Sequence, residues 1–378
     1  MQKSSFIVYI LTILFTIITI VAQPSLEEYM VLYEPKNSAE SKVFSKFVQI
    51  IKNVFNSNND SADLLQKSEG ISSVEPNNEL VVNSVKNASS NMRSQYSPKT
   101  WIAQDFAPWQ LSKTSSVNGK PINFYPYGVE YYLPKPQNDV VVYVIDSGID
   151  DTVEEFEGRV IHGKNFITNE PNTDLIGHGT SIAATIAGKL NGPIKHAKIV
   201  SIKVLNTNNT GKLYDFVESL NWAVDHKKKN FDSIPGIINF SINLVMYSKN
   251  LNYAFKKVFD NGMLTVASAG NQAKDACDFS PSGSEYVITT ASYTPQNIFD
   301  KDYSNYGKCV DILAPGVNVV SAKVNQPGQI NDVRPYVELK DLILKTAIKN
   351  QIAETPENTP NARLWNGYRG STSKVKFI

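Results

Sequence analysis

The sequence predicts an α/β fold, with a doubly wound parallel sheet that carries helices on both faces. Short runs rich in Val, Ile and Thr alternate with segments of helical spacing, which is typical of parallel sheets covered by helices. Polar residues also follow several of the apolar runs, as they do at the sites of such sheets. The predicted strands are residues 140–145, 197–205, 236–242, 264–269 and 286–291, and the predicted helices are residues 180–190, 212–226 and 251–261.

Length and composition are those of a globular protein. The chain has 378 residues, of which 42% are hydrophobic and 19% are charged, enough for one large domain and a small one. A formal net charge of +1 gives no electrostatic reason to expect nucleic acid or an anionic membrane as a partner. No C-x-x-C or His-rich tract indicates zinc, and we expect no required cofactor.

The N-terminus has the pattern of a targeting segment. Lys3 precedes an almost unbroken apolar run from Phe6 to Ala22, and Ala22 offers a small residue for signal peptidase. We predict a signal peptide over residues 1–22; the alternative is an uncleaved anchor, because the run approaches the length that spans a bilayer. Either outcome directs the chain to the secretory pathway, with a vacuolar or secreted fate and no membrane association after signal removal.

Glycosylation sequons agree with that compartment, although they also arise by chance. Three begin at Asn59, Asn87 and Asn208, and a fourth begins at Asn239 inside an apolar run, where we expect it to be buried. Oxidising surroundings favour a disulfide between the two cysteines, Cys277 and Cys309. The alternative is two free, half-buried thiols, since sequence spacing does not show whether the geometry permits a bridge.

A small module precedes the predicted sheet. Residues 29–33 predict a strand, residues 38–55 have helical spacing, and residues 71–82 predict two extended pieces separated at Pro76. The segment 83–100 is rich in Ser and Asn and predicts an exposed, cleavable linker. We therefore predict a propeptide over residues 23–93, with the linker running to about residue 100 and the main domain from 101 to 378. The alternative is a separate binding domain.

Three polar motifs predict a catalytic edge of the sheet. Asp146 ends an apolar run before a Ser-Gly turn, His178 stands between two glycines at a predicted helix start, and Asn271 ends another apolar run. An acid, a base and an amide in this order are suited to orient an imidazole and to stabilise an oxyanion. Each motif alone is better explained as a turn or a helix cap. Their ordered combination on a doubly wound pattern favours the catalytic interpretation.

The chain resembles the subtilisin-like serine proteases, specifically the cerevisin-type fungal members, over nearly its whole length. The segment 29–82 resembles the inhibitory, I9-like propeptide of that family, which is a small ferredoxin-like α+β domain. Further matches are the mature start at 107–111, the aspartate block at 142–149, the histidine block at 177–188, the asparagine block at 268–271, the very specific run 303–316, and the end region 356–361 with Asn366-Gly367.

This resemblance implies functional residues and partners. Asp146 and His178 match the acid and the base, and Asn271 matches the oxyanion donor. The family binds substrate along the segments that match Ser241, Ile242, Ala269 and Gly270. It often holds a structural calcium, here matched by the carbonyls of Glu285 and Val287 and the carboxylate of Asp311, although Asp311 could instead bond a turn. The implied partners are a peptide or protein substrate and the chain's own propeptide, for a monomeric protein.

The nucleophile of this family is missing from the sequence. A Gly-Thr-Ser turn and a central helix should follow Asn271, but the run ending at Val324 passes almost directly to a segment, 337–343, that resembles the helix beyond the central one. Ser371 and Ser373 lie in a charged tail that predicts no rigid position beside a base. Two explanations follow: coding sequence has been omitted near Val324, or the chain is a pseudoprotease that binds peptides, inhibits a protease or helps folding.

Overall fold

The structure is a computed structural model of the whole chain. It describes residues 27–33, 49–53, 71–76, 79–81, 101–116, 130–134, 139–324, 347–365 and 374–376. The chain divides into two compact units, one formed by residues 1–80 with 212–218 and the other by residues 81–211 with 219–378. The signal segment, the linker 83–100, Ser371, Ser373 and segment 337–343 lie outside the described residues.

The first unit contains a three-stranded antiparallel sheet in the order β2-β1-β3. Strand β1 (Glu27–Tyr33) matches the predicted strand, and β3 (Ile71–Pro76) and β4 (Glu79–Val81) match the two predicted extended pieces. The predicted helix over 38–55 is wrong at residues 49–53, which form β2 (Gln49–Asn53). Ile50 and Ile51 are β-branched and pair with Met30 and Tyr29 of β1, so a partner strand overrides the helical spacing.

The second unit is organised around a nine-stranded sheet in the order β15-β16-β14-β13-β12-β11-β7-β9-β8. All neighbouring strands are parallel except β15 and β16, which are antiparallel. The strands in chain order are β7 (Val141–Asp146), β8 (Val160–Asn165), β9 (Lys198–Lys203), β11 (Gly236–Phe240), β12 (Leu264–Ser268), β13 (Val287–Tyr293), β14 (Ile312–Pro315), β15 (Ile348–Lys349) and β16 (Ala362–Arg363). The five predicted strands of the main domain are confirmed, while β8 and the last three strands were not predicted.

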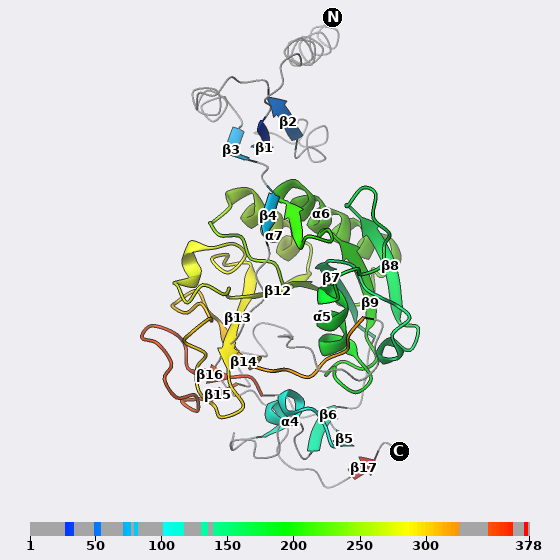
Figure 1. Ribbon diagram of the computed structural model, residues 1–378, viewed down its shortest axis with the longest axis vertical. Coiled ribbons are helices and arrows are strands. Elements are labelled where there is room, and N and C mark those ends of the chain that lie inside the picture. The colour runs from blue at the N-terminus through cyan, green and yellow to red at the C-terminus, as the bar shows by residue number, and fades with distance from the viewer. Residues whose placement is uncertain are drawn as a thin grey trace, which may run out of the picture. The chain divides into compact units, whose positions relative to one another are not determined.

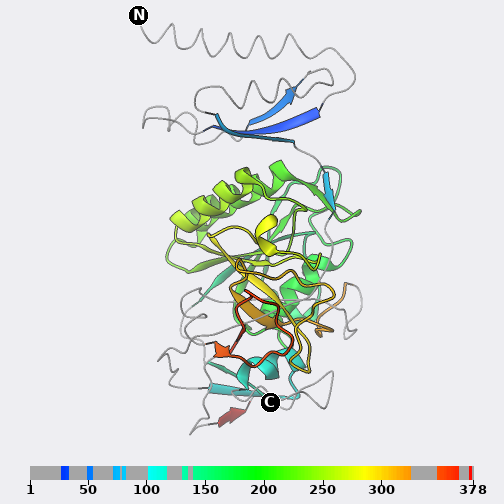
Figure 2. The ribbon, with the colours of Figure 1, turned by 90° about the vertical axis from the view of Figure 1, so that its left-hand side faces the viewer.

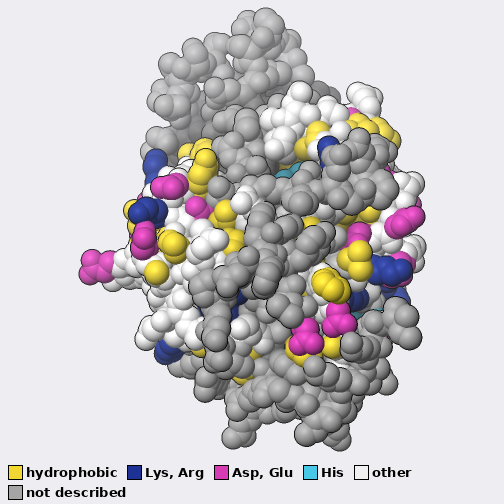
Figure 3. Space-filling view, turned by 60° about the horizontal axis from the view of Figure 1, so that its bottom comes forward, with side chains coloured by type: hydrophobic (Ala, Val, Ile, Leu, Met, Phe, Trp, Pro, Cys, Tyr) yellow, Lys and Arg dark blue, Asp and Glu magenta, His cyan; other side chains and the backbone are white. Residues whose placement is uncertain are grey.

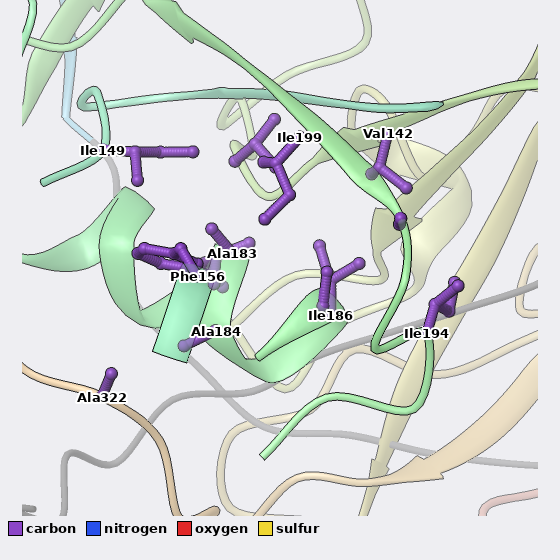
Figure 4. Packing of buried hydrophobic residues seen from close by; sticks show 13 residues of the cluster. Val142, Ile149, Phe156, Ala183, Ala184, Ile186, Ile194, Ile199 and Ala322 are labelled. Atoms are coloured by element: carbon purple, nitrogen blue, oxygen red, sulfur yellow. The ribbon is translucent and has the colours of Figure 1, made fainter. Parts of the chain in front are cut away.

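Helices cover both faces of this sheet, as the sequence predicts. Val142 and Val144 of β7 pack in one apolar cluster with Ala183 and Ala184 of α5 (His178–Ala187; Figure 4). On the opposite face, Phe240 of β11 meets Phe255 of α7 (Lys249–Asp260) with the two rings edge to face, 5.4 Å between centroids. Figures 1 and 2 show α6 (Leu213–Asn230) on the same side as α7, and α5 on the other.

Shorter elements complete the description. They are the 3-10 turns η1 (Glu154–Phe156) and η2 (Ala276–Asp278) and the short strand β10 (Thr210–Lys212). Asn239, the asparagine of the fourth sequon, is only 3% exposed on β11 at the centre of the sheet, as expected.

A second, small sheet joins segments from both ends of the main domain. Strand β5 (Trp101–Asp105) pairs antiparallel with β6 (Glu130–Pro134) and parallel with β17 (Lys374–Lys376). The helix α4 (Trp109–Ser115) follows β5. The C-terminal tail was predicted to offer Ser371 and Ser373 no rigid position beside a base; residues 374–376 pair with β5, but the two serines lie outside the described residues, so this stays a prediction.

One face of the molecule shows how its charged side chains are distributed. On the face shown in Figure 3, acidic and basic side chains are interspersed, in keeping with the net charge of +1. Among the helices described here, none is both long and apolar enough to cross a bilayer.

Candidate active site

Asp146 stands at the carboxyl end of β7 and is completely buried. Its Oδ1 accepts a hydrogen bond from the backbone N–H of Ser147 at 2.7 Å and lies 2.7 Å from Nδ1 of His178. Gly148 turns the chain back with φ of +99°, and a Cβ there would lie 2.7 Å from the carbonyl oxygen of Asn172. The strand therefore delivers the acid into a tight turn that only glycine can complete.

His178 begins helix α5, and its side chain is 18% exposed. Because a carboxylate can only accept, Nδ1 donates to Asp146 and Nε2 remains available to take a proton. Burial lowers the pKa of His178, but the charge of Asp146, their hydrogen bond and the charge of Asp174 outweigh it and raise the pKa overall. This is the arrangement of a general base oriented by a buried acid.

The approach of α5 to the Asp146 turn depends on Gly179. A Cβ at this position would lie 2.2 Å from the carbonyl oxygen of Gly148 and 3.1 Å from Cβ of Asp146. No side chain larger than hydrogen fits in that space without displacing backbone. The glycine after His178 therefore allows the helix to come close enough for the bond to Asp146.

Asn271 lies at the same edge of the sheet, just beyond the end of β12. Phe240 of β11 pairs with both Ile145 of β7 and Ala267 of β12, so β7 and β12 end level with each other, two strands apart. Two strand spacings are about 10 Å. The side chain of Asn271 is half-buried, and its backbone N–H donates to Oε1 of Gln272 at 2.8 Å.

The predicted substrate-binding residues border this edge. Ala269 and Gly270 form the turn before Asn271, where φ of Gly270 is +107° and the side chain of Asn305 donates to the Ala269 carbonyl at 2.9 Å. Ser241 and Ile242 follow β11; Ser241 is half-buried and Ile242 is completely buried. An apolar run that the sequence analysis overlooked comes next along the chain, with Val245 and Met246 each 62% exposed and Tyr247 41% exposed.

Residues 321–324, which follow β14, lie against the start of α5. Ser321 Oγ donates to the Ser181 carbonyl at 2.6 Å, and Ser181 Oγ donates to the Ala322 carbonyl at 2.7 Å. Ala322 also belongs to the apolar cluster of α5 (Figure 4). Two residues later, a side-chain atom of Val324 lies 3.4 Å from the position that a Cβ of Gly177 would occupy. The chain therefore comes close to Gly177, the residue before His178, at Val324, which is the last residue described ahead of position 325.

A Gly-Thr-Ser run does occur at residues 179–181, but it does not present a nucleophile. Ser181 is completely buried within α5, and its hydroxyl is engaged by the Ala322 carbonyl. It follows His178 by only three positions on the same helix, whereas a nucleophile must reach both the base and a substrate carbonyl.

The two cysteines are joined by a disulfide, as predicted, with Cα atoms 5.3 Å apart. Cys277 lies in η2, after the Asn271 turn, and Cys309 precedes β14. The bond therefore links the loop that follows Asn271 to the residues just before β14.

The calcium ligands implied by the resemblance are only partly suited to a cation. Oδ2 of Asp311 accepts a hydrogen bond from the backbone N–H of Thr289 at 2.9 Å, which is the turn-bonding alternative considered for this residue. Within the described ranges, no three His, Cys, Asp or Glu side chains gather closely enough to hold a metal ion. The resemblance implies backbone carbonyl oxygens of Glu285 and Val287 as the other ligands, and a calcium site here stays a prediction.

Two buried charged residues near the site were not found from the sequence. Lys203 pairs with Asp146 across β9 and β7, and its Nζ donates to the Ser147 carbonyl at 2.6 Å while lying 3.2 Å from Oε2 of Glu170. Asp174 precedes α5 and accepts hydrogen bonds from Ser147, which follows Asp146, and from Thr180, which lies two residues after His178. An acid just ahead of a predicted helix start was the available signal for Asp174. Lys203 gave none, because it ends an ordinary apolar strand.

The fold and this pair of side chains define a subtilisin-like serine peptidase framework. The Peptidase_S8 subtilase family matches residues 137–361, more than half of the chain, and the chain belongs to the subtilase family. The crystal structure of a cold-adapted subtilisin-like serine proteinase matches with a TM-score of 0.60 and 26% identity, covering 69% of this chain and 99% of that one.

Curated relatives come from fungi. The chain is 33% identical over 290 residues to Subtilase-type proteinase psp3 of Schizosaccharomyces pombe, covering 70% of this chain and 63% of the relative. It is 36% identical over 223 residues to Subtilisin-like protease 5 of Arthroderma benhamiae, covering 59% of this chain and 54% of the relative. The chain thus spans between about half and two thirds of the length of these relatives.

Proposed function

We propose that this chain carries the acid–base half of a serine endopeptidase site and that, as written, it hydrolyses no peptide bond by a serine mechanism. The 2.7 Å contact between His178 Nδ1 and Asp146 Oδ1 carries this proposal, together with the absence of a Gly-Thr-Ser run after Asn271. In a complete site, Nε2 of His178 would take the serine proton during attack and return it to the leaving amine. Asn271 would donate to the developing oxyanion.

The missing nucleophile belongs to a segment omitted after Val324. Three features support this: the hydrogen bonds of Ser321 and Ala322 to α5, the proximity of Val324 to Gly177, and a family match that continues beyond Val324 to residue 361. An omitted coding segment would therefore start beside the base that its serine requires. Reading the nucleotides between the codons of Val324 and Asn325 for an in-frame Gly-Thr-Ser segment tests this explanation directly.

The remaining expectations concern processing and location. We propose that residues 1–22 direct the chain to the secretory pathway, to be vacuolar or secreted, and that residues 23–93 form the propeptide of a monomeric protein. The antiparallel sheet of β1, β2 and β3 supports a small α+β propeptide. Because subtilase propeptides are removed by self-cleavage, the chain as written should keep this segment unless another protease cuts the linker.

The decisive experiment expresses the full chain in a host without vacuolar proteases and follows its size and its labelling by an irreversible serine-directed phosphonate. We expect the precursor to keep its size after signal removal and to stay unlabelled. Processing near residues 83–100 that disappears in His178→Ala would show that the chain has a nucleophile. Processing that persists in His178→Ala would instead point to a host protease.

The second candidate is a non-catalytic pseudoprotease that binds peptides or acts as an inhibitor or folding helper. The exposed Val245, Met246 and Tyr247, next in the chain after Ser241 and Ile242, favour peptide binding. Fluorescence anisotropy with labelled apolar peptides would reveal it. Saturable binding that Met246→Ser weakens, without any cleavage, would favour this candidate over an incomplete coding sequence.

A further inference from the structure

Asp174 is a buried carboxylate with an unusual number of donors around it. It is 2% exposed and lies four residues before His178. Oδ1 accepts hydrogen bonds from Ser147 Oγ at 2.9 Å and from the backbone N–H groups of Ile176 and Gly177 at 3.1 and 2.8 Å. Oδ2 accepts from the backbone N–H and the hydroxyl of Thr180 at 2.9 and 2.7 Å. Both oxygens are thus satisfied by neutral donors.

The Asp174 carboxylate and the Ser147 hydroxyl supply the capping that α5 does not obtain from its own N-cap residue. The first N–H groups of a helix have no partner within the helix, and the N-cap side chain usually satisfies the second or third. Here the N-cap is Gly177, which has no side chain to offer. Ser147 Oγ accepts from the second N–H group of the helix, that of Gly179, at 2.9 Å. Asp174 accepts from the third N–H group, that of Thr180. Residues outside the helix therefore cap it.

The same residues belong to the turn that carries Asp146. Ser147, whose hydroxyl joins Asp174 to Gly179, directly follows Asp146 in the chain. Thr180 Oγ1 in turn accepts the backbone N–H of Asp150 at 3.0 Å. Ser147 and Thr180 are both completely buried. The carboxylate of Asp174 therefore lies at the centre of a closed set of bonds between the strand end that carries the acid and the helix start that carries the base.

We propose that Asp174 is a positioning residue of this site: its buried carboxylate fixes the first turn of α5 against the Asp146 turn and so holds His178 in its bond to Asp146. Its hydrogen bonds go to Ser147, Gly177 and Thr180 and not to the imidazole, so it positions His178 through these neighbours, while its charge also raises the pKa of His178. This role needs no nucleophile, and it can be measured in the chain as it stands. It is also independent of whether the chain cleaves peptides.

The test substitutes Asp174→Asn in the full chain and follows the imidazole of His178 by NMR, where it is one of only four histidines. The asparagine amide can accept on one side only, so one set of donors would face an NH₂ group. We expect the pKa of His178 to fall and the downfield signal of its bonded Nδ1 proton to weaken. Signals of His162, His196 and His226 should stay in place.

Asp150→Asn is the matched control. Asp150 is buried in the same turn and loses the same charge, but its carboxylate bonds only the backbone and hydroxyl of Thr152. The control should leave the pKa and the Nδ1 signal of His178 unchanged. An equal change in both variants would mean that general loss of charge or stability, and not the bridging by Asp174, controls His178, and the proposal would fall.

Ser147→Ala keeps the experiment informative if Asp174→Asn does not fold. It leaves the charge of Asp174 and its bonds to Gly177 and Thr180 in place, and it removes the hydroxyl that joins Asp174 to the Gly179 N–H. We expect the Nδ1 signal of His178 to weaken, with a smaller change in pKa than charge removal causes. A folded Ser147→Ala protein whose His178 signal and pKa match the parent would overturn the proposal.

Discussion

The two sides of the catalytic edge are held together in different ways. On the acid–base side, Asp146 and His178 are fixed by buried hydrogen bonds among residues 146–180 and by the close approach of Gly179. On the side that follows β14, long-range links hold the chain. Ser321 and Ala322 are bonded to α5, and Arg363 of β16 donates to the Lys113 carbonyl of α4 at 2.7 Å.

This difference explains how Asp146 and His178 can keep their geometry without the serine segment that we propose is omitted. The hydrogen bonds that join the start of α5 to the Asp146 turn are made by residues 146–180, so none of them involves residues beyond Val324. The other side depends on segments that return from far along the chain. Changes on the acid–base side should therefore alter His178, whereas changes on the other side should alter stability and leave His178 in place.

The largest expected effect comes from adding a nucleophile to the side of the catalytic edge that follows β14. Inserting a Gly-Thr-Ser turn and its following helix, taken from a similar subtilase, between Val324 and Asn325 should create peptidase activity. In subtilisin itself, loss of the serine lowers kcat by about 2 × 10⁶, so a gain approaching that size is the upper limit. Hydrolysis of a chromogenic peptide measures it. The same insertion with Ala in place of the serine is the control and should stay inactive.

Removing the disulfide should have the next largest effect. The bond closes a loop with a sequence separation of 32, for which the chain-entropy model gives about 3–4 kcal/mol of stabilisation. Replacing both Cys277 and Cys309 by Ser should lower the free energy of unfolding by that order, measured by urea denaturation. Because the bond joins two residues outside the range 146–180, the NMR signals of His178 should not move. A shift of those signals would contradict the comparison.

Gly179→Ala should break the acid–base side. Its Cβ would meet the Gly148 carbonyl at 2.2 Å, so we expect a loss at the upper end of the ~1–3 kcal/mol typical of overpacking, together with a displaced His178. Thermal unfolding and the His178 Nδ1 proton signal measure the two effects. Gly158→Ala is the control: its φ is +75° but nothing lies within 4 Å, so it should cost ~1–2 kcal/mol and leave His178 unchanged.

Lys113 makes the second side sensitive to pH. Burial, and then the charge of Arg363, lower the pKa of Lys113 to about 7. The unfolded chain therefore binds more protons than the folded one between pH 7 and the ordinary lysine value of about 10.4, so stability should rise with pH across that window. Lys113→Met should stabilise by ~1–4 kcal/mol at pH 6, and this gain should shrink by pH 9. Denaturation at both values tests this, with the exposed Lys189→Met as control.

Chelation should have the smallest effect. One oxygen of Asp311 is engaged by the Thr289 N–H, so we expect the melting temperature of the chain to be the same with and without a calcium chelator. A calcium ion present at 100 times its dissociation constant would contribute about 2.7 kcal/mol. A clear fall in melting temperature that Asp311→Asn abolishes would instead establish the site.

The fold class, the placement of Asp146, His178 and Asn271 at one edge of the sheet, and the lack of a Gly-Thr-Ser run after Asn271 could all be read from the amino-acid sequence. These features are local: apolar runs alternate with helical spacing, and the carboxyl ends of parallel strands necessarily meet at one edge. The burial of Asn239 followed from the same pattern. No tertiary information was needed for any of them.

Only the tertiary structure decided which groups hold these residues in place. Ser147 and Asp174 are 27 positions apart, and Ser181 and Ala322 are 141 apart, so no local pattern marks them as partners. The same applies to β2, whose strand conformation depends on its pairing with β1, and to residues 374–376, which need β5. A hydrogen bond or a strand pair is specified by two segments together, and neither segment alone contains that information.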